Sequence, residues 1–194
     1  YVVGVKFQSA YFENYGLMGL TALAAAIKES RKLGIKVIMD AKRGDIGSTS
    51  TAYATAYLAK KNSGNNSDFE SDYLTVNPLM GEDCIRPFVD VALQFGKGIF
   101  LLLETSNTGA SMILKQSIGG EQTINDKIAD FINEEHRKLN IKPNEFGPIG
   151  CVIGATNSAT KKWREKLPNS LFLMPGIGAQ NGQWQCVKES LTVQ

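Results

Sequence analysis

The stretch Lys36-Val37-Ile38-Met39-Asp40-Ala41-Lys42-Arg43-Gly44-Asp45 passes directly from apolar residues into a group of charges. Its apolar half is typical of a buried strand, and Asp40 and Lys42, two positions apart, would point to the same side of that strand. An exposed loop whose charges face water is the alternative interpretation. Barrel folds built from parallel strands collect their chemistry at the carboxyl ends of the strands, so we interpret residues 40–45 as a candidate site.

Strand and helix patterns alternate on both sides of this stretch. Strands are predicted at residues 2–7, 36–40, 73–76, 98–103, 149–153 and 171–174. Helices are predicted at residues 17–33, 49–61, 83–95, 124–139 and 159–167. Such alternation implies parallel strands joined by helical crossovers. The nearly continuous apolar character of the strands implies that both of their faces are covered.

A doubly wound sheet and a closed barrel both satisfy this pattern. No G-x-G-x-x-G motif follows the first strand, which disfavours a dinucleotide-binding fold. An eight-stranded barrel usually needs ~250 residues, whereas this chain has 194 and opens with Tyr1 inside an apolar run. We therefore expect an α/β fold of the (β/α)8 TIM-barrel class, in one domain over residues 1–194, with the first and last strands missing from the chain.

The amino-acid composition disfavours some classes of binding partner. The chain has 21 basic and 19 acidic residues, and a net charge of +2 disfavours a nucleic-acid partner while leaving room for a small anionic ligand. It has no signal peptide and no apolar run near the ~20 residues that span a bilayer, so no membrane partner is expected. Cys84 and Cys151 lie in apolar stretches and are interpreted as core residues rather than nucleophiles. These features favour a cytoplasmic protein.

His136 is the single histidine and lies in a polar segment, residues 133–138. We expect it to be exposed on a helix. Because no second histidine stands at ligand spacing, no metal site is predicted. Residues 108–122 contain three glycines and directly follow a predicted strand, which is typical of a loop at the active-site face of a barrel.

Lys6 strengthens the candidate site. It lies near the end of the first predicted strand among apolar neighbours, where a lysine needs a partner. The next strand ends at Asp40, so adjacent parallel strands would place Lys6 beside Asp40 and Lys42. Such an array lets a carboxylate neutralise each ammonium group while a strong local field is retained.

Four segments, in order, resemble the orotidine 5′-monophosphate decarboxylase family. The segment that begins at Asp40 is similar to the family's D-x-K-x-x-D-I signature. The others are similar to its lysine strand, its pyrimidine-binding strand end and its phosphate-side loop: Val5-Lys6-Phe7-Gln8, Glu104-Thr105-Ser106-Asn107 and Pro175-Gly176-Ile177-Gly178-Ala179-Gln180. The resemblance covers nearly the whole chain.

The resemblance implies a reaction and roles for the charged residues. The family decarboxylates orotidine 5′-monophosphate to uridine 5′-monophosphate in de novo pyrimidine biosynthesis, without a metal or organic cofactor. Lys42 would deliver a proton to the ring carbon, and Asp40 would lie against the departing carboxylate. Lys6 would hold Asp40 and a ribose hydroxyl. Asp45 would reach across a homodimer interface into the neighbouring site.

The resemblance also implies the substrate-binding residues Gln8, Ile46, Thr49, Ser106, Gly178 and Gln180. Ser106 would hydrogen-bond the pyrimidine, and Gln180 would bridge base and phosphate. Gln8 stands where the family more often has asparagine. The family's ribose-binding aspartate and phosphate-binding arginine have no counterpart here, and we expect them to lie outside the chain.

Two other functions remain open. A sugar-phosphate decarboxylase or aldolase on the same barrel would use Mg²⁺ with an extra carboxylate beside the signature, where Ala41 and Gly44 offer none. A non-catalytic nucleotide-binding relative would have no use for the four charged positions, since buried charges without a function are costly.

Overall fold

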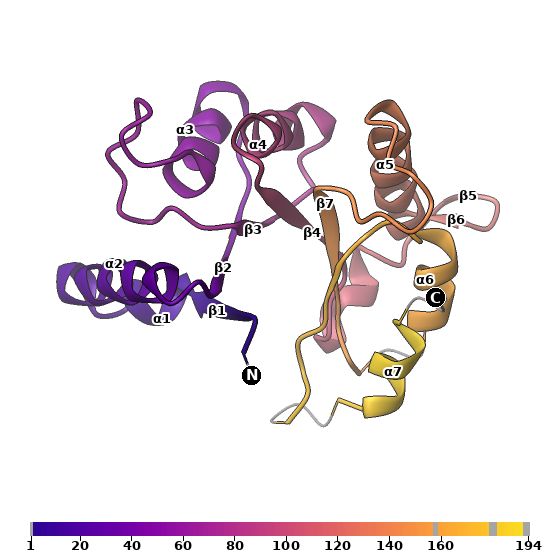
Figure 1. Ribbon diagram of the computed structural model, residues 1–194. Helices are drawn as coiled ribbons and strands as arrows, with labels where there is room; N and C mark the ends of the chain where they lie inside the picture. The colour runs from indigo at the N-terminus through magenta and orange to yellow at the C-terminus, as the bar shows by residue number, and fades with distance from the viewer. Residues whose placement is uncertain (1, 157–158, 179–181, 192–194) are drawn as a thin grey trace. The chain divides into compact units, whose positions relative to one another are not determined.

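The chain divides into two compact units, residues 1–99 and 100–194. The computed structural model, drawn in Figure 1, describes residues 2–156, 159–178 and 182–191. Over these ranges, no helix is both long enough and apolar enough to cross a membrane.

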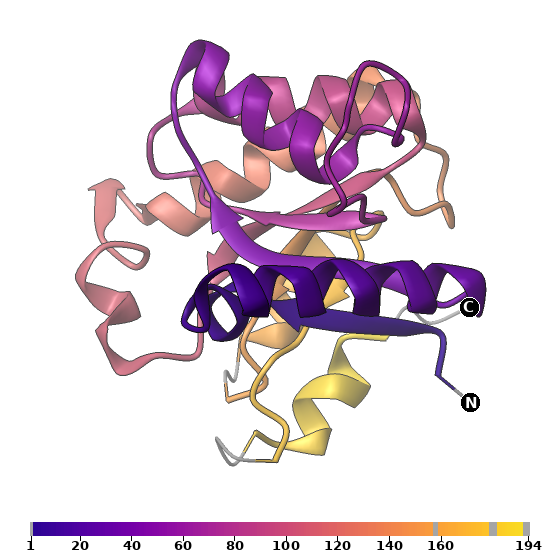
Figure 2. The same ribbon diagram turned by 90° about the vertical axis from the view of Figure 1, so that its left-hand side faces the viewer.

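The first unit alternates strands and helices around three parallel strands. Its elements are β1 (Gly4–Gln8), α1 (Ser9–Glu13), α2 (Gly16–Lys32), β2 (Lys36–Arg43), α3 (Gly47–Leu58), β3 (Tyr73–Val76) and α4 (Glu82–Phe95). β1 and β2 pair in parallel from Gly4–Lys36 to Gln8–Asp40, and β3 pairs in parallel with β2. The long helix α2 runs alongside β1 and β2, and α3 lies beside α4 (Figure 2).

The core of the first unit forms where the apolar runs of its strands meet these helices. Val37 and Met39 of β2 and Leu74 and Val76 of β3 are fully buried. Burying each such side chain stabilises the fold by about 1.5–3 kcal/mol. Burial continues past the apolar run to Asp40, so the core delivers the first charged residue of the candidate site into a largely water-free position.

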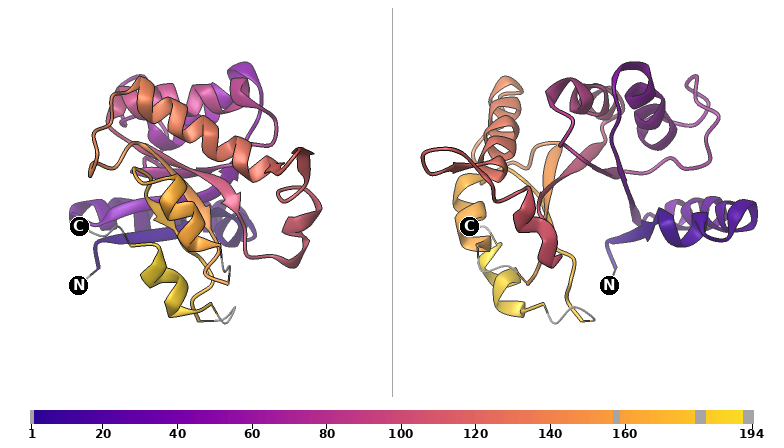
Figure 3. Two further views of the ribbon diagram at one scale, coloured as in Figure 1. Left: turned by 90° about the vertical axis from the view of Figure 1, so that its right-hand side faces the viewer. Right: turned by 180° about the vertical axis from the view of Figure 1, so that it is seen from behind.

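The second unit repeats the alternation. Its elements are β4 (Gly98–Glu104), which begins just before the boundary, the 3₁₀ helix η1 (Thr108–Met112), β5 (Ser117–Gly119), β6 (Gln122–Thr123), α5 (Ile124–Lys138), β7 (Ile149–Ile153), α6 (Thr160–Lys166), β8 (Phe172–Leu173) and α7 (Trp184–Glu189). β4, β7 and β8 are neighbours in that order, and β7 pairs in parallel with β8. α5 packs on β7, and α6 packs on α7 (Figure 3).

The strand–helix order confirms the predicted α/β fold of the (β/α)-barrel class. Within the first unit β1, β2 and β3 are neighbours in chain order, and so are β4, β7 and β8 in the second, as successive βα units require. The prediction of a single domain stays a prediction, as does the expectation that strands are missing.

The segment at residues 108–122 has more structure than the predicted loop. η1 and the short antiparallel hairpin of β5 and β6 lie between β4 and α5. Ala110 and Leu114 are buried and fix the first part of this segment against the unit. Its position directly after β4 agrees with the prediction.

The burial of two cysteines and of the histidine can be compared with what the sequence predicts. Cys84 and Cys151 are buried and free, as predicted. The prediction for His136 was wrong, because its residue is only 4% exposed. It lies one helical turn beyond the buried Ile132 on α5, so it continues that helix's inward face. His136 is flanked by charged residues at 134, 135, 137 and 138, which made the whole segment resemble an exposed one.

Candidate active site

The carboxyl ends of β1 and β2 bring the predicted cluster together. Gln8 is the register partner of Asp40, and Lys6 lies two residues earlier on the same face of β1. The Lys6 Nζ atom lies 2.8 Å from Asp40 Oδ2, and Gln8 Nε2 donates to the same oxygen at 3.0 Å. Parallel pairing therefore confirms the predicted contact between Lys6 and Asp40.

The other oxygen of Asp40 is held from β2 and β3. Lys42 Nζ donates to Oδ1 at 2.6 Å, and the hydroxyl of Thr75 donates to Oδ1 at 3.0 Å. Each carboxylate oxygen thus has two donors, which satisfies a buried charge that would otherwise be very costly. Thr75 is a residue that the sequence analysis missed.

The ionisation of Asp40 follows from these contacts. Burial alone would raise the pKa of the carboxyl group, but hydrogen bonds and charges from Lys42 and Lys6 outweigh burial and hold the pKa below its ordinary value of 3.8. Asp40 is therefore an anion at neutral pH. The side chains of Lys6 and Lys42 are 33% and 43% exposed, so both ammonium groups remain open to a ligand.

Lys42 has an unusual backbone. Its φ of +48° lies in the left-handed region, which costs a non-glycine residue about 1–2 kcal/mol. The pairing of β2 with β3 shifts between Met39 and Arg43, so the chain leaves the regular ladder at this point. The Lys42 N–H donates instead to the side-chain oxygen of Thr75 at 2.9 Å. A strained residue at a strand end is a feature found at functional sites.

Arg43 belongs to a different set of contacts. Its guanidinium pairs with Glu13 at 2.6 Å, donates to the Tyr57 hydroxyl at 3.2 Å and lies 5.2 Å from the centre of the Tyr53 ring. Arg43 thus fixes β2 to α1 and α3.

The residues after β2 lie at the surface of the first unit. Asp45 accepts a hydrogen bond from the Ile46 N–H at 2.8 Å. Within the described ranges, Asp45 forms no ion pair with Lys6 or Lys42. Ile46 is 58% exposed, and Thr49 is also exposed. A single chain therefore holds Lys6, Asp40 and Lys42 together, whereas Ile46 and Thr49 are exposed and Asp45 is half-buried.

Gly44 allows the turn that leads to these residues. A Cβ atom at this position would lie 2.9 Å from the Asn77 carbonyl oxygen, so a larger residue would push β2 away from the end of β3. The Asn77 N–H donates to the Arg43 carbonyl at 2.8 Å and closes the same junction.

Ser106 lies after β4 in the second unit, beside the end of β7. A Cβ atom on Gly154 would come within 2.6 Å of the Ser106 Cβ, so the glycine permits this close approach. Ser106 helps to line a hollow of about 290 Å³ with Thr105, Asn107, Lys115 and Thr156. The hollow is polar and can offer several hydrogen bonds to a ligand.

Glu104 is a second residue that the sequence analysis did not single out. Its buried carboxylate pairs with Lys115 at 2.9 Å and accepts a hydrogen bond from the Trp163 indole N–H. These bonds join the end of β4 to the following segment and to α6. The quoted Glu-Thr-Ser-Asn motif contained the signal, because a glutamate that ends an apolar strand needs partners.

The phosphate-side loop is described only in part. Gly178 has a φ of +92°, a backbone conformation that favours glycine, and a Cβ placed on it would meet no atom within 4 Å. Gln180, predicted to bind substrate, lies outside the described residues.

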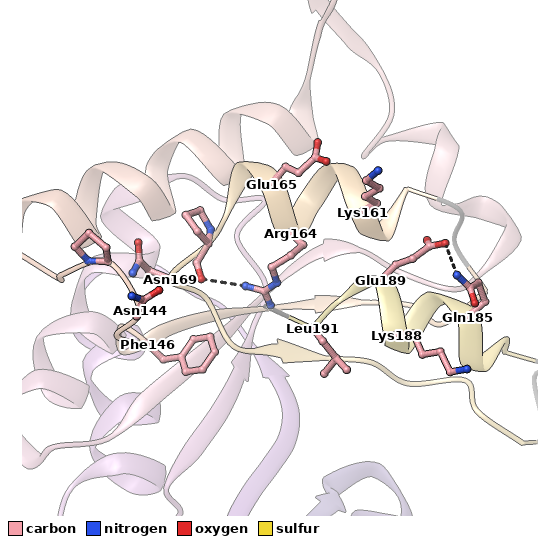
Figure 4. A pocket seen from close by; sticks show the side chains of 12 residues that line it. Asn144, Phe146, Lys161, Arg164, Glu165, Asn169, Gln185, Lys188, Glu189 and Leu191 are labelled. Atoms are coloured by element: carbon pink, nitrogen blue, oxygen red, sulfur yellow. Dashed lines mark hydrogen bonds between the residues drawn. The ribbon is translucent and has the colours of Figure 1, made fainter. Parts of the chain in front are cut away.

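A larger cavity of about 760 Å³ lies elsewhere in the second unit (Figure 4). It is bounded by α6, α7 and the segments that precede β7 and β8, so it lies at the amino ends of these strands. Arg164 fills part of it and donates to the Leu167 and Pro168 carbonyls at 2.9 and 3.2 Å. Its place at the amino ends separates it from Ser106 and Gly178, which follow carboxyl ends.

No group of three or more histidine, cysteine, aspartate or glutamate side chains that could hold a metal ion occurs in the part of the chain that the structure describes. The chemistry offered by the described cluster is that of two ammonium groups and one carboxylate, with amide and hydroxyl donors around it.

Comparisons with known proteins show which family the chain resembles. The sequence profile of the orotidine 5′-phosphate decarboxylase / HUMPS family matches residues 1–189. The chain is 39% identical over 188 residues to the orotidine 5′-phosphate decarboxylase of Rhodopirellula baltica, a match that covers 96% of this chain and 61% of that protein.

Two solved structures from Leishmania donovani are similar in fold. Its OMP decarboxylase superposes with a TM-score of 0.74 at 31% identity, covering 97% of this chain and 64% of that one. Its UMP synthase gives a TM-score of 0.76 at 34% identity, covering 97% of this chain and 37% of that one. The chain thus spans less than two thirds of the length of each of these relatives.

Proposed function

The chain belongs to the orotidine 5′-phosphate decarboxylase / HUMPS family, and on that premise we propose that the protein decarboxylates orotidine 5′-monophosphate to uridine 5′-monophosphate in de novo pyrimidine biosynthesis. The observation that carries the proposal is the Asp40 carboxylate held between Lys6 and Lys42, at 2.8 and 2.6 Å, at the carboxyl ends of two parallel strands. The names of the relatives support the same substrate.

The proposed reaction breaks the bond between the pyrimidine ring and its carboxylate. Carbon dioxide leaves, and the bonding electron pair stays on the ring carbon. The Lys42 ammonium then donates a proton to that carbon, which leaves a neutral amine on Lys42 and yields the product. Catalysis would come from a preorganised field and a positioned proton donor.

Asp40 would act by its charge. Because its pKa lies below the ordinary value, the carboxylate is anionic when the substrate binds. Placed against the substrate carboxylate, it disfavours the bound ground state relative to a transition state whose negative charge is moving into the ring. Lys6 would keep Asp40 in place and bind a ribose hydroxyl.

The remaining predicted residues would bind the rest of the nucleotide. Gln8 lies beside Asp40 and would face the ribose, and Ser106 would bind the pyrimidine. Gly178 and Gln180 would lie on the phosphate side, where exposed backbone N–H groups suit an anion.

We propose a homodimer with shared sites, in which Asp45, Ile46 and Thr49 serve the partner's site. Support comes from exposed apolar side chains on the segments that follow β1, β2 and β3: Tyr11, Tyr15, Leu17, Met18, Ile46, Leu79 and Met80. An apolar surface at the carboxyl ends of three strands is typical of a protein interface. A cytoplasmic location is proposed as well, and the free thiols of Cys84, Cys151 and Cys186 suit a reducing compartment.

One assay tests the proposal. The loss of orotidine 5′-monophosphate absorbance is followed with the full-length protein, with and without EDTA, beside Lys42→Ala and a control, Lys28→Ala, at an exposed position on α2. We expect turnover that EDTA does not change, loss of turnover in Lys42→Ala and normal turnover in the control. Turnover that EDTA abolishes, or unchanged turnover in Lys42→Ala, would reject the proposed metal-independent mechanism.

A further inference from the structure

We propose that Thr75 is a positioning residue that sets the geometry of both Asp40 and Lys42, an inference that rests on the function proposed above. Thr75 lies on β3 and is fully buried. Its hydroxyl donates to Asp40 Oδ1 at 3.0 Å and accepts from the Lys42 N–H at 2.9 Å. One hydroxyl group therefore connects the side chain of the proposed anion with the backbone of the proposed proton donor.

The direction of this connection is fixed by chemistry. The Lys42 N–H can only donate, and an ionised Asp40 carboxylate can only accept. The single hydroxyl proton of Thr75 must therefore point to Asp40, and an oxygen lone pair must face Lys42. A group that could only donate would leave the Lys42 N–H without this acceptor. A group that could only accept would leave Asp40 Oδ1 with one donor, Lys42 Nζ, instead of two.

The backbone at Lys42 explains why the hydroxyl is needed. The ladder between β2 and β3 is regular at Met39–Leu74 and resumes at Arg43–Val76, so four residues of β2 are matched by two of β3. Thr75 lies opposite this irregular part. Its hydroxyl oxygen accepts a hydrogen bond from the N–H of Lys42, the residue whose φ is +48°. The Thr75 bond thus replaces a ladder bond where the chain bends to aim Lys42 at Asp40.

Burial makes the hydrogen bonds of Thr75 difficult to replace. Thr75 is fully buried and Asp40 is nearly so, hence water has little access to replace a missing hydroxyl. Thr75 is also β-branched, which restricts rotation about its Cα–Cβ bond and holds the hydroxyl in one direction. The Lys42 ammonium, by contrast, is partly exposed and depends on its backbone for a defined position.

Paired substitutions in the full-length protein test the role. Thr75→Val keeps the shape and removes the hydroxyl, whereas Thr75→Ser keeps the hydroxyl. We expect Thr75→Val to lower kcat by ~10–100-fold, the size expected when a hydrogen bond to a charged group is lost. We expect KM to change by less than ~3-fold, because the substrate contacts remain. Thr75→Ser should restore kcat to within ~3-fold of the parent protein.

Two controls separate positioning from a loss of folding. Thr160→Val makes the same change at a buried threonine of α6 and should leave kcat unchanged. Thermal unfolding of each variant shows whether the protein is folded at the assay temperature. A fall in kcat of Thr75→Val that merely matches its unfolded fraction, or a similar fall in Thr160→Val, would overturn the proposal.

Two NMR measurements do not depend on activity. Hydrogen exchange of the Lys42 amide should be faster in Thr75→Val than in Thr75→Ser, and the titration midpoint of the Asp40 carboxyl carbon should move to higher pH. An unchanged Lys42 amide and Asp40 midpoint, a kcat within ~2-fold of the parent, or a Thr75→Ser variant as slow as Thr75→Val would each contradict the role. If the parent protein fails to turn over orotidine 5′-monophosphate, the proposed function fails, and these NMR measurements still decide the role of Thr75.

Discussion

Asp40 determines the charge balance of the candidate site, because Lys6 and Lys42 both face its carboxylate. We predict that Asp40→Asn lowers kcat/KM by ~1000-fold or more, since the preorganised negative charge is lost and the two ammonium groups repel each other. Steady-state kinetics measure the effect, with Asp130→Asn, an exposed aspartate on α5, as the control. A fall of less than ~10-fold would remove Asp40 from the mechanism.

His136 gives the fold a dependence on pH. Burial lowers the pKa of the imidazole below its ordinary value of 6.5, outweighing the nearby Ile149 backbone and Glu135 charge, and neither ring nitrogen has a hydrogen-bond partner in the described part of the chain. The fold therefore favours the neutral ring. Above pH 6.5 the ring is neutral in both the folded and the unfolded chain, and His136 costs the folded protein no stability. As the pH falls below 6.5, the unfolded chain binds a proton more readily than the folded protein, so the free energy of unfolding decreases.

We predict that the free energy of unfolding falls by ~1 kcal/mol between about pH 7.5 and about pH 5.5, and that His136→Leu removes this part of the pH dependence. Urea unfolding at both values measures it. A Cβ atom on Gly147 would lie 2.4 Å from Nε2, so this glycine packs directly against the ring. An equal pH dependence in His136→Leu would show that other groups cause it.

The carboxylate of Asp126, at the start of α5, connects α5 with α6. Asp126 completes a capping box with Thr123, and its Oδ1 lies 3.1 Å from Lys166 Nζ of α6. Burial alone would raise the pKa of Asp126, but the hydrogen bonds from Thr123 and Lys166 hold it far below its ordinary value of 3.8. This contribution to stability is present above pH 3.8 and is lost as the pH falls through the lower value of the folded protein.

We predict that Asp126→Ala lowers the free energy of unfolding by ~2–3 kcal/mol at neutral pH, because both a helix cap and an interhelical charge pair are lost. Asp130→Ala, one turn later and half exposed, should cost less than ~1 kcal/mol although it also pairs with Lys166. Chemical unfolding of both variants makes the comparison. Equal losses would mean that the charge pairs alone, and not the cap, determine the effect.

The buried strands and the long helices could be predicted from the sequence because their apolar patterns are local. β3 and β7 match the predicted ranges. α4 and α5 differ from theirs by one residue at one end, and α2 is shifted by one residue at both ends. The short elements α1, β5, β6 and α7 were not predicted, since a few residues carry too little periodicity to specify a helix or a strand. Tertiary contacts decide these short elements instead.

The same distinction holds within the site. The contact of Lys6 with Asp40 could be predicted because parallel pairing places neighbouring strand ends side by side. The role of Thr75 could not, because it depends on an irregular ladder and a positive φ at Lys42, neither of which has a local sequence pattern. The buried pair of Glu104 and Lys115 likewise joins residues that only the folded chain brings together.

At the scale of the whole molecule, the proposed division of the site between two chains rests on which residues pair within one chain and which are exposed. Lys6 and Lys42 both pair with Asp40, whereas the Asp45 carboxylate accepts from the Ile46 N–H and Ile46 is exposed. In a dimer with shared sites, a Lys42→Ala chain still supplies Asp45 to its partner. An Asp45→Ala chain still supplies its own Lys42.

We therefore predict that two inactive variants, Lys42→Ala and Asp45→Ala, recover about a quarter of the parent activity when their subunits exchange, because half of the dimers are mixed and each has one intact site. A mixture of Asp40→Ala with Lys42→Ala is the matched control and should stay inactive, since both residues act in their own chain. Activity is measured after exchange has been confirmed by mass spectrometry of the intact dimers. No recovery in the first mixture would place Asp45 outside the partner's site, and recovery in the control would show that Asp40 or Lys42 acts across the interface.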